Sequence, residues 1–453
     1  MIGDLKPHAA YKDSGQDWLG SIPAHWSLLR AKCLFREVDE RSKTGNEELL
    51  SVSHLTGVTP RRLKTVTMFM AESNVGHKVC RPGDLVINTL WAWMAALGVT
   101  RHTGLVSPAY GVYRPIDGSG ILPAYADHLL RLPMYAAEYQ RRSTGVNSSR
   151  LRLYPEQFLR VAVLVPPLNE QALIVRFLDW VNGRLERTIR AKRKVITLLN
   201  EQRRAVIRSA VTRGLNSAVK FQPTGIPWLG DIPAHWQISR VKNECRCLDI
   251  LRAPLNSVER GRMTMRAYDY YGASGVIDKV DDYLFDDELL LIAEDGANLI
   301  LRNLPLAIIA KGKFWVNNHA HILKPRRGNI TYLAYLLESL NFRPWISGAA
   351  QPKLTQNRLM SILIAVAPPA EQDAIVLHAD RQSQPLTATI SRLEREIELL
   401  REYRSRLVAD VVTGKLDVRE VAARLPDEAL PATAEESIDE ADTAELIDEE
   451  TEA

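Results

Sequence analysis

The chain has 453 residues, of which 46% are hydrophobic and 25% are charged. These proportions are typical of a globular protein, and the length is too great for a single hydrophobic core. An apolar run of about 18 residues and a basic-then-apolar start are both missing from the sequence, which argues against a membrane span and a secretory signal peptide. We therefore expect a cytoplasmic protein without a membrane partner, whose four cysteines are reduced thiols.

The formal charge of +4 is unevenly distributed. Residues 427–453 hold twelve Asp or Glu and no Lys or Arg, so residues 1–426 carry a net charge of +16. A body this basic favours a polyanionic partner such as nucleic acid, although the charge also fits a basic surface beside a solubilising tail. The acidic tail contains no aromatic residue, and we expect it to be disordered.

The first motif along the chain is a ten-residue phrase that occurs twice. It reads DWLGSIPAHW at Asp17–Trp26 and PWLGDIPAHW at Pro227–Trp236, with eight of ten positions identical. We call it the Trp phrase. Its recurrence at this length indicates an internal duplication into two units of roughly 200 residues. We expect His25 and His235, which belong to the phrase, to be structural rather than catalytic.

Two dissimilar segments, residues 20–165 and 230–367, follow the two phrases. Both have the short apolar runs and Gly/Pro punctuation of mixed α/β domains, with buried strands expected at 83–87 and 288–292. The two segments barely resemble each other. The sequence therefore predicts one repeated frame that carries two different heads, an arrangement suited to two similar tasks on two different targets.

Several polar loops in the heads could contact nucleic acid. The basic run at residues 59–64 suits phosphate contact, and the matching loops 144–150 and 347–353 each end in a cation that could approach backbone or base edges. Asn317 and Asn318 could pair with base edges. Each of these loops fits an ordinary surface turn as well. The DNA-binding candidates are Arg61, Arg62, Lys64, Asn147, Ser148, Arg150, Asn317, Asn318, Gln351 and Lys353.

Each head is followed by a Pro-Pro-(x)-x-Glu-Gln motif and a long helical stretch, roughly residues 170–213 and 371–414. The paired prolines fit just before a first helical turn. Gly214 and Gly414 suit helix C-termini, where a left-handed residue is favoured. About 40 residues at 1.5 Å per residue reach roughly 60 Å, which is longer than a small domain needs.

The two helical stretches share a heptad pattern. Their apolar positions, 201 residues apart, follow the 4-3 spacing of a coiled-coil seam, with polar interruptions at Lys192 and Arg404. The first stretch is strongly basic and the second slightly acidic, which favours pairing with each other. The alternative is two amphipathic helices, each packed on its own domain. The seam residues are Leu185, Ile189, Ile196, Leu199, Leu386, Ile390, Leu393, Ile397 and Leu400.

We expect no metal site and no catalytic residue in this chain. Cys245 and Cys247 have no second pair at zinc spacing. Glu294 and Asp295 could form a nuclease metal pair, but we see no suitably placed lysine and favour a solvated turn. The sequence also contains neither a phosphate-binding loop nor the Asn/Asp-Pro-Pro-aromatic motif of adenine methyltransferases.

The order of these motifs resembles the specificity subunit of type I restriction–modification systems. The resemblance covers about residues 10–416 and rests on both Trp phrases, both Pro-Pro motifs and both heptad helices. It implies an α/β fold with two target-recognition domains separated by two long antiparallel helices, related by a pseudo-twofold repeat. The implied domains are 1–166, 167–216 (helix), 217–368, 369–416 (helix) and an acidic tail at 417–453.

The resemblance also implies a function without catalysis in this chain. Each target-recognition domain would read one half of a bipartite site on double-stranded DNA, and the helices would bind two modification subunits. S-adenosylmethionine would be bound by those subunits, and ATP and Mg²⁺ by a restriction subunit where one is present. The alternatives are a self-contained restriction–methylation enzyme and an interaction scaffold that does not bind DNA.

Overall fold

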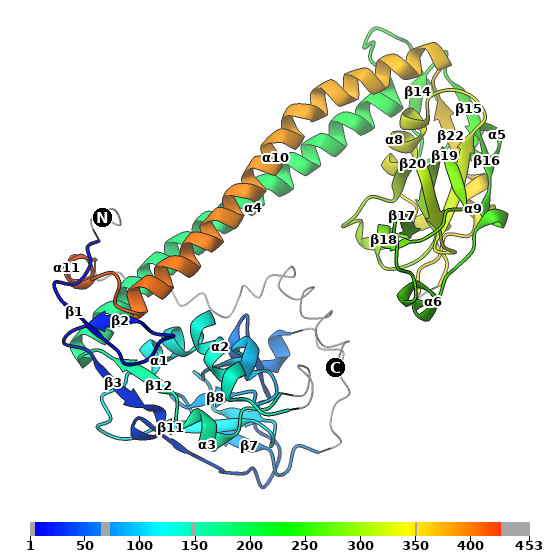
Figure 1. Ribbon diagram of the computed structural model, residues 1–453. Coiled ribbons are helices and arrows are strands. Elements are labelled where there is room, and N and C mark those ends of the chain that lie inside the picture. The colour runs from blue at the N-terminus through cyan, green and yellow to red at the C-terminus, as the bar shows by residue number, and fades with distance from the viewer. Residues whose placement is uncertain (1–4, 65–72, 146–150, 349–350, 427–453) are drawn as a thin grey trace. The chain divides into compact units, whose positions relative to one another are not determined.

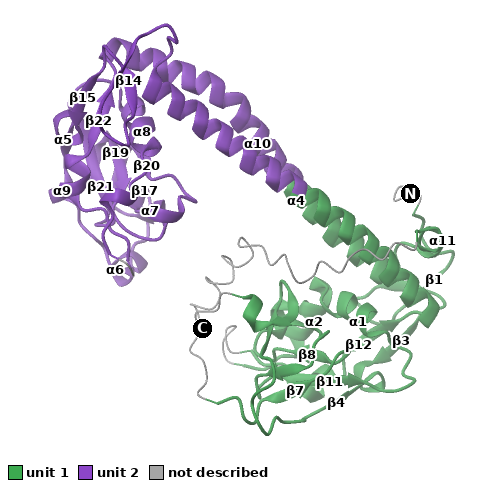
Figure 2. Cartoon of the chain, turned by 180° about the vertical axis from the view of Figure 1, so that it is seen from behind, with its two compact units in different colours: residues 1–190, 397–453 green, residues 191–396 purple. Residues whose placement is uncertain are grey.

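A computed structural model describes residues 5–64, 73–145, 151–348 and 351–426. Residues 427–453 of the expected acidic tail therefore lie outside the described residues, whereas residues 417–426 are described and include a short helix at Arg419–Ala423. The chain forms two units, residues 1–190 with 397–453 (unit 1) and residues 191–396 (unit 2) (Figure 2). Each unit contains one head and one end of each of two long helices, α4 (Leu168–Arg213) and α10 (Pro369–Val412) (Figure 1).

Both Trp phrases form the same small frame of strands. In unit 1 the phrase supplies β2 (Ser21–Pro23), which pairs with β1 (Tyr11–Asp13). The following strand β3 (Ser27–Arg30) pairs with β12 (Ala162–Val165), which directly precedes the Pro-Pro motif. Unit 2 repeats this arrangement with four strands: β13 (Phe221–Pro223) on β14 (Asp231–Pro233), and β15 (Gln237–Arg240) on β22 (Leu363–Val366).

The head of unit 1 is built around a four-stranded antiparallel sheet in the order β4-β11-β8-β9. Two further antiparallel strand pairs, β5 with β6 and β7 with β10, and three helices complete it. Their bounds are β4 Phe35–Glu37, β5 Leu50–Ser53, β6 Gly57–Pro60, β7 Lys78–Cys80, β8 Leu85–Ile87, β9 Leu97–Val99, β10 Gly104–Val106, β11 Gly111–Pro115, α1 Pro123–Leu130, α2 Pro133–Arg142 and α3 Pro155–Phe158. Short 3₁₀ turns occur at Ala31–Cys33, Arg61–Leu63 and Ala92–Met94.

The head of unit 2 has a different sheet of six strands, in the order β16-β21-β19-β20-β17-β18. All pairs are antiparallel except β17 with β20. The bounds are β16 Cys245–Cys247, β17 Tyr268–Gly272, β18 Gly275–Val280, β19 Phe285–Ala293, β20 Ala307–Val316, β21 Ala320–Pro325, α5 Val241–Glu244, α6 Ser257–Gly261, α7 Asn298–Leu301, α8 Ile330–Ser339 and α9 Gln356–Ser361, with 3₁₀ turns at Asp249–Leu251 and Arg343–Trp345. The expectation of a repeated frame around two unlike heads is thus confirmed.

The long helices end where the sequence predicts. Gly214 directly follows α4, and Gly414 lies just after the end of α10. Both have left-handed backbone, with φ of +72° and +76°. A residue with a Cβ is strained in this left-handed region of the backbone, so glycine is favoured there. A short helix, α11 (Arg419–Ala423), follows in unit 1. Across the described part of the chain, every helix falls short of the length and apolarity that crossing a membrane requires.

The helices α4 and α10 pair in antiparallel fashion. In unit 1, Arg404 forms an ion pair with Glu186, and in unit 2, Lys192 pairs with Glu396 at 2.5 Å. As the residue number on α4 increases, the residue number of its partner on α10 decreases, so the two helices run in opposite directions. The two polar interruptions of the heptads are therefore matched by a carboxylate on the opposite helix. The nine predicted seam residues are all buried or half-buried.

Candidate nucleic-acid interface

The His–Trp pair that ends the first Trp phrase holds the start of helix α4. His25 Nε2 lies 2.8 Å from Glu170 Oε2, and Trp26 Nε1 donates to Glu170 Oε1 at 3.1 Å. Glu170 is in the first turn of α4, where the positive end of the helix dipole favours a carboxylate. Because Trp26 is fully buried, its indole N–H needs this acceptor.

Unit 2 repeats the same anchor at the start of α10. His235 Nε2 lies 2.8 Å from Glu371 Oε2, and Trp236 Nε1 donates to the same oxygen at 3.1 Å. The second anchor is more exposed to solvent, since the Glu371 side chain is 26% exposed and that of Glu170 only 3%. This geometry gives both histidines a structural contact with a helix terminus, in agreement with the expectation from the sequence.

The glutamine next to each of these glutamates connects the frame to the head. Gln171 Oε1 accepts from the backbone N–H of Leu122 at 2.7 Å, and its Nε2 donates to the carbonyl of Pro166. Gln372 Oε1 accepts from Asn329 N–H at 2.8 Å, and its Nε2 donates to Ala367. Leu122 and Asn329 are the N-cap residues of α1 and α8. The two heads are therefore attached at equivalent points despite their different sheets.

The C-terminal end of each long helix packs against the Trp phrase that anchors the start of the other long helix. A Cβ on Gly414, after α10, would lie 2.4 Å from Pro23 Cγ and 2.9 Å from Trp26. A Cβ on Gly214, after α4, would lie 3.3 Å from Trp236. Each frame thus joins one Trp phrase, the start of one long helix and the end of the other.

The DNA-binding candidates of unit 1 are only partly described. Arg61 and Arg62 lie in the 3₁₀ turn Arg61–Leu63, and Lys64 follows it. The exposed Arg62 forms an ion pair with Glu48 at 2.7 Å. The other three candidates of this unit lie outside the described residues: Asn147, Ser148 and Arg150.

The candidates of unit 2 fall into two kinds. Asn317 is buried, and its Oδ1 accepts from His319 N–H at 2.8 Å, so it completes a turn instead of facing solvent. Asn318, Gln351 and Lys353 are exposed. Lys353 Nζ lies 3.1 Å from Glu294 Oε1 with half of its side chain in solvent, so its charge stays accessible to a phosphate.

A buried ionic network underlies these exposed residues, and sequence reasoning missed it. His321 Nδ1 lies 2.6 Å from Asp249 Oδ2, and His321 Nε2 donates to the carbonyl of Leu354 at 2.7 Å. Glu294 pairs with Arg252 and with Lys353. The expected solvated turn at Glu294–Asp295 is therefore wrong: both residues are less than 10% exposed.

Two carboxyls of the network have lowered pKa values despite their burial. Burial opposes ionisation of Asp249, but the hydrogen bond and charge of His321, together with the N–H of Ile322, hold the pKa of the carboxyl below its usual value. Burial likewise opposes ionisation of Glu294, and its contacts with Arg252, His321 and Lys353 together leave its pKa lowered. Both ring nitrogens of His321 are already engaged, so a metal ion here would have to displace one of these bonds. The network fixes the loop that carries Lys353.

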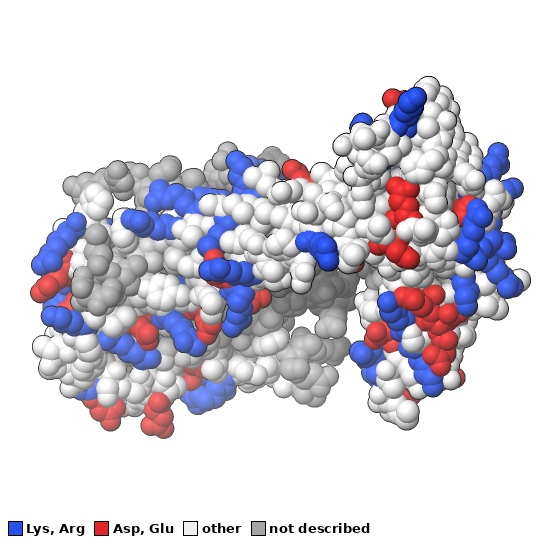
Figure 3. Space-filling model, turned by 90° about the horizontal axis from the view of Figure 1, so that it is seen from above, with Lys and Arg blue, Asp and Glu red and all other residues white. Residues whose placement is uncertain are grey.

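No short motif in the sequence marks this network, because its members lie far apart along the chain. Asp249 is in a 3₁₀ turn, Glu294 follows β19 and His321 is in β21. A lysine does approach Glu294, but from a loop almost 60 residues later. On the face drawn in Figure 3, Lys and Arg form clusters interleaved with Asp and Glu, so charge alone does not outline a DNA surface there.

Comparison with known proteins shows which families and proteins parts of this chain resemble. Residues 262–399, which cover most of the second head and most of α10, match the family described as the type I restriction modification DNA specificity domain. A Haemophilus influenzae protein described as a type I restriction enzyme specificity subunit is 38% identical over 109 residues, 24% of this chain and 28% of that protein. The family match covers less than a third of the chain, so these comparisons show a similarity to type I specificity subunits over part of its length.

Two further proteins resemble longer parts of the chain. The specificity subunit of the type I restriction enzyme StySPI from Salmonella potsdam is 21% identical over 224 residues, 46% of this chain and 47% of that protein. The chain thus spans less than half the length of either curated relative. A chain from a structural study of assembly and conformational transition in a type I restriction–modification system shares the fold, with a TM-score of 0.56 at 15% identity over 87% of this chain and 99% of that one.

Proposed function

We propose that this chain is the DNA sequence-recognition subunit of a type I restriction–modification complex. Each head reads one half of a bipartite site on double-stranded DNA. The observation that carries the proposal is the frame built twice, with the same His–Trp–Glu anchor and the same Gln contact, around two unlike sheets. Two heads joined in one chain make the second half-site contact intramolecular, so two weak contacts combine into tight binding.

The proposed partners follow from the same assignment. The paired helices α4 and α10 bind two modification subunits, which carry the methyltransferase chemistry and S-adenosylmethionine. A restriction subunit, where one is present, supplies the ATP- and Mg²⁺-dependent steps. This chain itself is non-catalytic: its Pro-Pro pairs start helices and follow Val165 and Ala367, so the polar group that holds a flipped adenine is missing. DNA as the substrate implies a cytoplasmic site of action.

Contacts to DNA come from polar residues of the two heads. In unit 1 these are Arg61, Arg62 and Lys64, together with the loop that contains Asn147, Ser148 and Arg150. In unit 2 they are Asn318, Gln351 and Lys353. Cations among them neutralise phosphates and set the register, and the amides are suited to base edges. Buried Asn317 acts indirectly, because it shapes the turn that presents Asn318.

Methylome sequencing tests the proposal directly. Co-expression of the chain with its modification subunit should produce methylated adenine at one asymmetric, interrupted sequence. Replacement of residues 20–165 by the first head of another specificity subunit should change one half of that sequence and leave the other half intact. A continuous motif, no motif, or a change in both halves would contradict the proposal. Methylation by the purified chain alone with S-adenosylmethionine would instead indicate a self-contained enzyme.

A further inference from the structure

Unit 1 contains a buried histidine that has no counterpart in unit 2. His8 precedes β1 and packs beside His25 and Trp26, with ring centroids 5.4 Å and 5.7 Å away. The two Trp phrases are 210 residues apart, and the residue 210 positions after His8 is Ala218. The anchor of unit 2 forms without a second histidine, so the frame itself does not require His8.

Among the residues that the structure describes, none forms a hydrogen bond with the buried imidazole of His8. Its side chain is 2% exposed, and its Nδ1 is a buried atom without a hydrogen-bond partner in that part of the chain. Nε2 lies 3.7 Å from Glu170 Oε1, and Nδ1 lies 3.7 Å from Asp417 Oδ2, both too long for a hydrogen bond. Buried polar groups almost always form a hydrogen bond. A buried imidazole that lies between two carboxylates without a hydrogen bond to either is therefore unusual.

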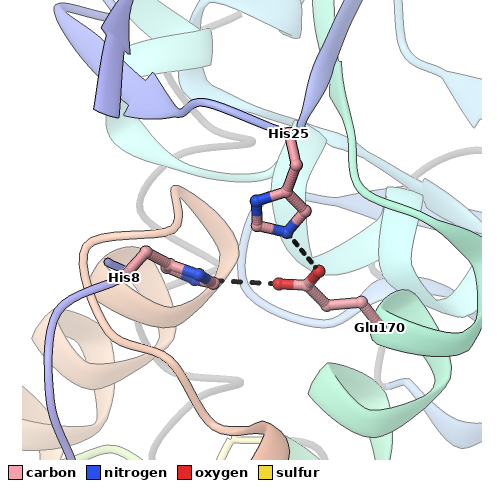
Figure 4. Close-up of side chains that lie close together, drawn as sticks. All are labelled: His8, His25 and Glu170. Atoms are coloured by element: carbon pink, nitrogen blue, oxygen red, sulfur yellow. Dashed lines mark hydrogen bonds and ion pairs between the residues drawn. The ribbon is translucent and has the colours of Figure 1, made fainter. Parts of the chain in front are cut away.

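Figure 4 shows His8, His25 and Glu170 converging on one point. One ligand atom from each of the three lies within 4.8 Å of the others. Two zinc ligands at about 2.0–2.2 Å from the ion are roughly 3.3–3.6 Å apart in a tetrahedron. The 3.7 Å separation of His8 Nε2 and Glu170 Oε1 is therefore too long for a hydrogen bond but close to that of two atoms sharing an ion.

We propose that His8, His25 and Glu170 form a binding site for a divalent transition-metal ion, Zn²⁺ in the first instance, in unit 1. Two imidazoles and one carboxylate are a common zinc donor set. The position of Asp417 supports it, because a metal-bound histidine usually directs its other N–H to a carboxylate, and Asp417 faces Nδ1 of His8. This inference goes beyond the proposed function and does not depend on it.

An ion would replace the 2.8 Å contact between His25 Nε2 and Glu170 Oε2, and the remaining contacts of the cluster are compatible with it. Trp26 Nε1 donates to Glu170 Oε1, whose second lone pair stays available on the side of His8. His25 would bind through Nε2 with its proton on Nδ1, and its side chain is 40% exposed. Burial lowers the pKa of His8, which favours the neutral ring that a metal ion requires.

The site would fasten the start of the chain to the frame. The backbone N–H of His8 donates to Tyr11 Oη, which in turn donates to the carbonyl of Gly414. The backbone of Lys6 forms an antiparallel β-bridge with that of Asp417, beyond the end of α10. An ion held by His8, His25 and Glu170 would link this segment to the first turn of α4 and to the end of α10. Zinc should therefore slow amide exchange in residues 5–13 and 414–420.

The test uses the full chain, purified without a histidine tag and treated with a chelator. Titration with Zn²⁺, followed by equilibrium dialysis and metal analysis, should show one ion per chain. His8→Gln and His8→Ala should both weaken binding by more than about tenfold, since each removes one of three protein ligands. His235→Ala, in the anchor that lacks a second histidine, and His378→Ala, on the exposed surface of α10, should leave the stoichiometry unchanged.

X-ray absorption of the zinc-loaded wild-type chain gives a readout that needs no variant. It should show nitrogen and oxygen ligands, including two imidazoles, at about 2.0–2.2 Å. Sulfur ligands at about 2.3 Å would place the ion on cysteine and overturn the proposal. So would less than one ion per chain, loss of binding in His235→Ala, or binding that both His8 variants retain. Folding of each variant is checked by circular dichroism.

Discussion

Alanine at Gly414 should destabilise unit 1 more than alanine at Gly214 destabilises unit 2. Both glycines end a long helix in left-handed backbone, with φ of +76° and +72°. That conformation costs an L-residue about 1–2 kcal/mol at either position. The two substitutions therefore share a backbone cost, and any difference between them reports how tightly each helix end packs against the opposite Trp phrase.

The packing costs differ because the neighbours differ. At Gly414 the new Cβ would meet Pro23 Cγ at 2.4 Å and Trp26 at 2.9 Å, and both are rigid rings in a buried core. Overpacking of this kind adds about 1–3 kcal/mol. At Gly214 the nearest atom is Glu371 Oε1 at 3.0 Å, the end of a side chain that is 26% exposed and whose other carboxylate oxygen makes the anchor contacts. We expect a loss of about 2–5 kcal/mol for Gly414→Ala and about 1–2 kcal/mol for Gly214→Ala.

Hydrogen exchange measured by mass spectrometry can separate the two units, which a single unfolding transition would not. Gly414→Ala should accelerate exchange around residues 20–30 and 405–416, and Gly214→Ala should have a smaller effect around residues 205–214 and 230–240. Gly225→Ala is the control for the backbone cost alone, since φ is +68° and a Cβ there meets nothing within 4 Å. Equal effects at Gly414 and Gly225 would refute the packing argument.

Three further predictions concern the helices and the second head. Deletion of one heptad from both α4 and α10 removes about 10.5 Å of helix, so the methylated half-sites should move closer by on the order of three base pairs; an unchanged gap would refute a spacer role. Lys353→Ala should weaken DNA binding by the assembled complex uniformly across sequences and reduce the salt slope by about 1. Lys311→Ala, at another exposed lysine of unit 2 paired with a glutamate, is its control, and equal losses in both variants would contradict a specific contact. Hydrogen bonding to His321 lowers the pKa of Asp249 in the folded state, so its contribution to stability is present above about pH 4 and is lost as the pH falls through the folded value. Acid titration by near-UV circular dichroism should show a smaller loss in Asp249→Asn, and an unchanged acid profile would exclude this contribution.

The frame could be predicted from the sequence because its signals are local and repeated. The heptads, the paired prolines and the glycines after each helix are recognisable within a few residues, and the structure confirms Gly214 and Gly414 as left-handed helix ends. The role of Glu170 could not be predicted in the same way, since its partners His25 and Trp26 are about 145 residues away. The charges that interrupt the heptads likewise become intelligible only through the opposite helix.

The candidate DNA contacts were less predictable, because exposure depends on long-range packing. Asn317 and Asn318 are neighbours with the same side chain, yet one is buried in a turn and the other faces solvent. Glu294 looked solvated in sequence because the groups that cover it, Arg252 and Lys353, come from distant segments. The sequence of these polar loops therefore did not separate exposed residues from buried, supporting ones. The site residues stay a prediction until DNA binding is measured.

The way the heads are attached explains how one frame can carry two unlike domains. Gln171 and Gln372 accept from backbone N–H groups at the N-caps of α1 and α8, and Tyr135 and Tyr332 each accept from a backbone N–H at or next to the strand before the Pro-Pro motif. Backbone donors are present whatever the side chain, so these attachments require a helix in the right place but little of the head's own sequence. Such contacts allow the sheet and its loops to change without disturbing the frame. Exchange of a head should therefore preserve folding and alter only the DNA sequence that is read.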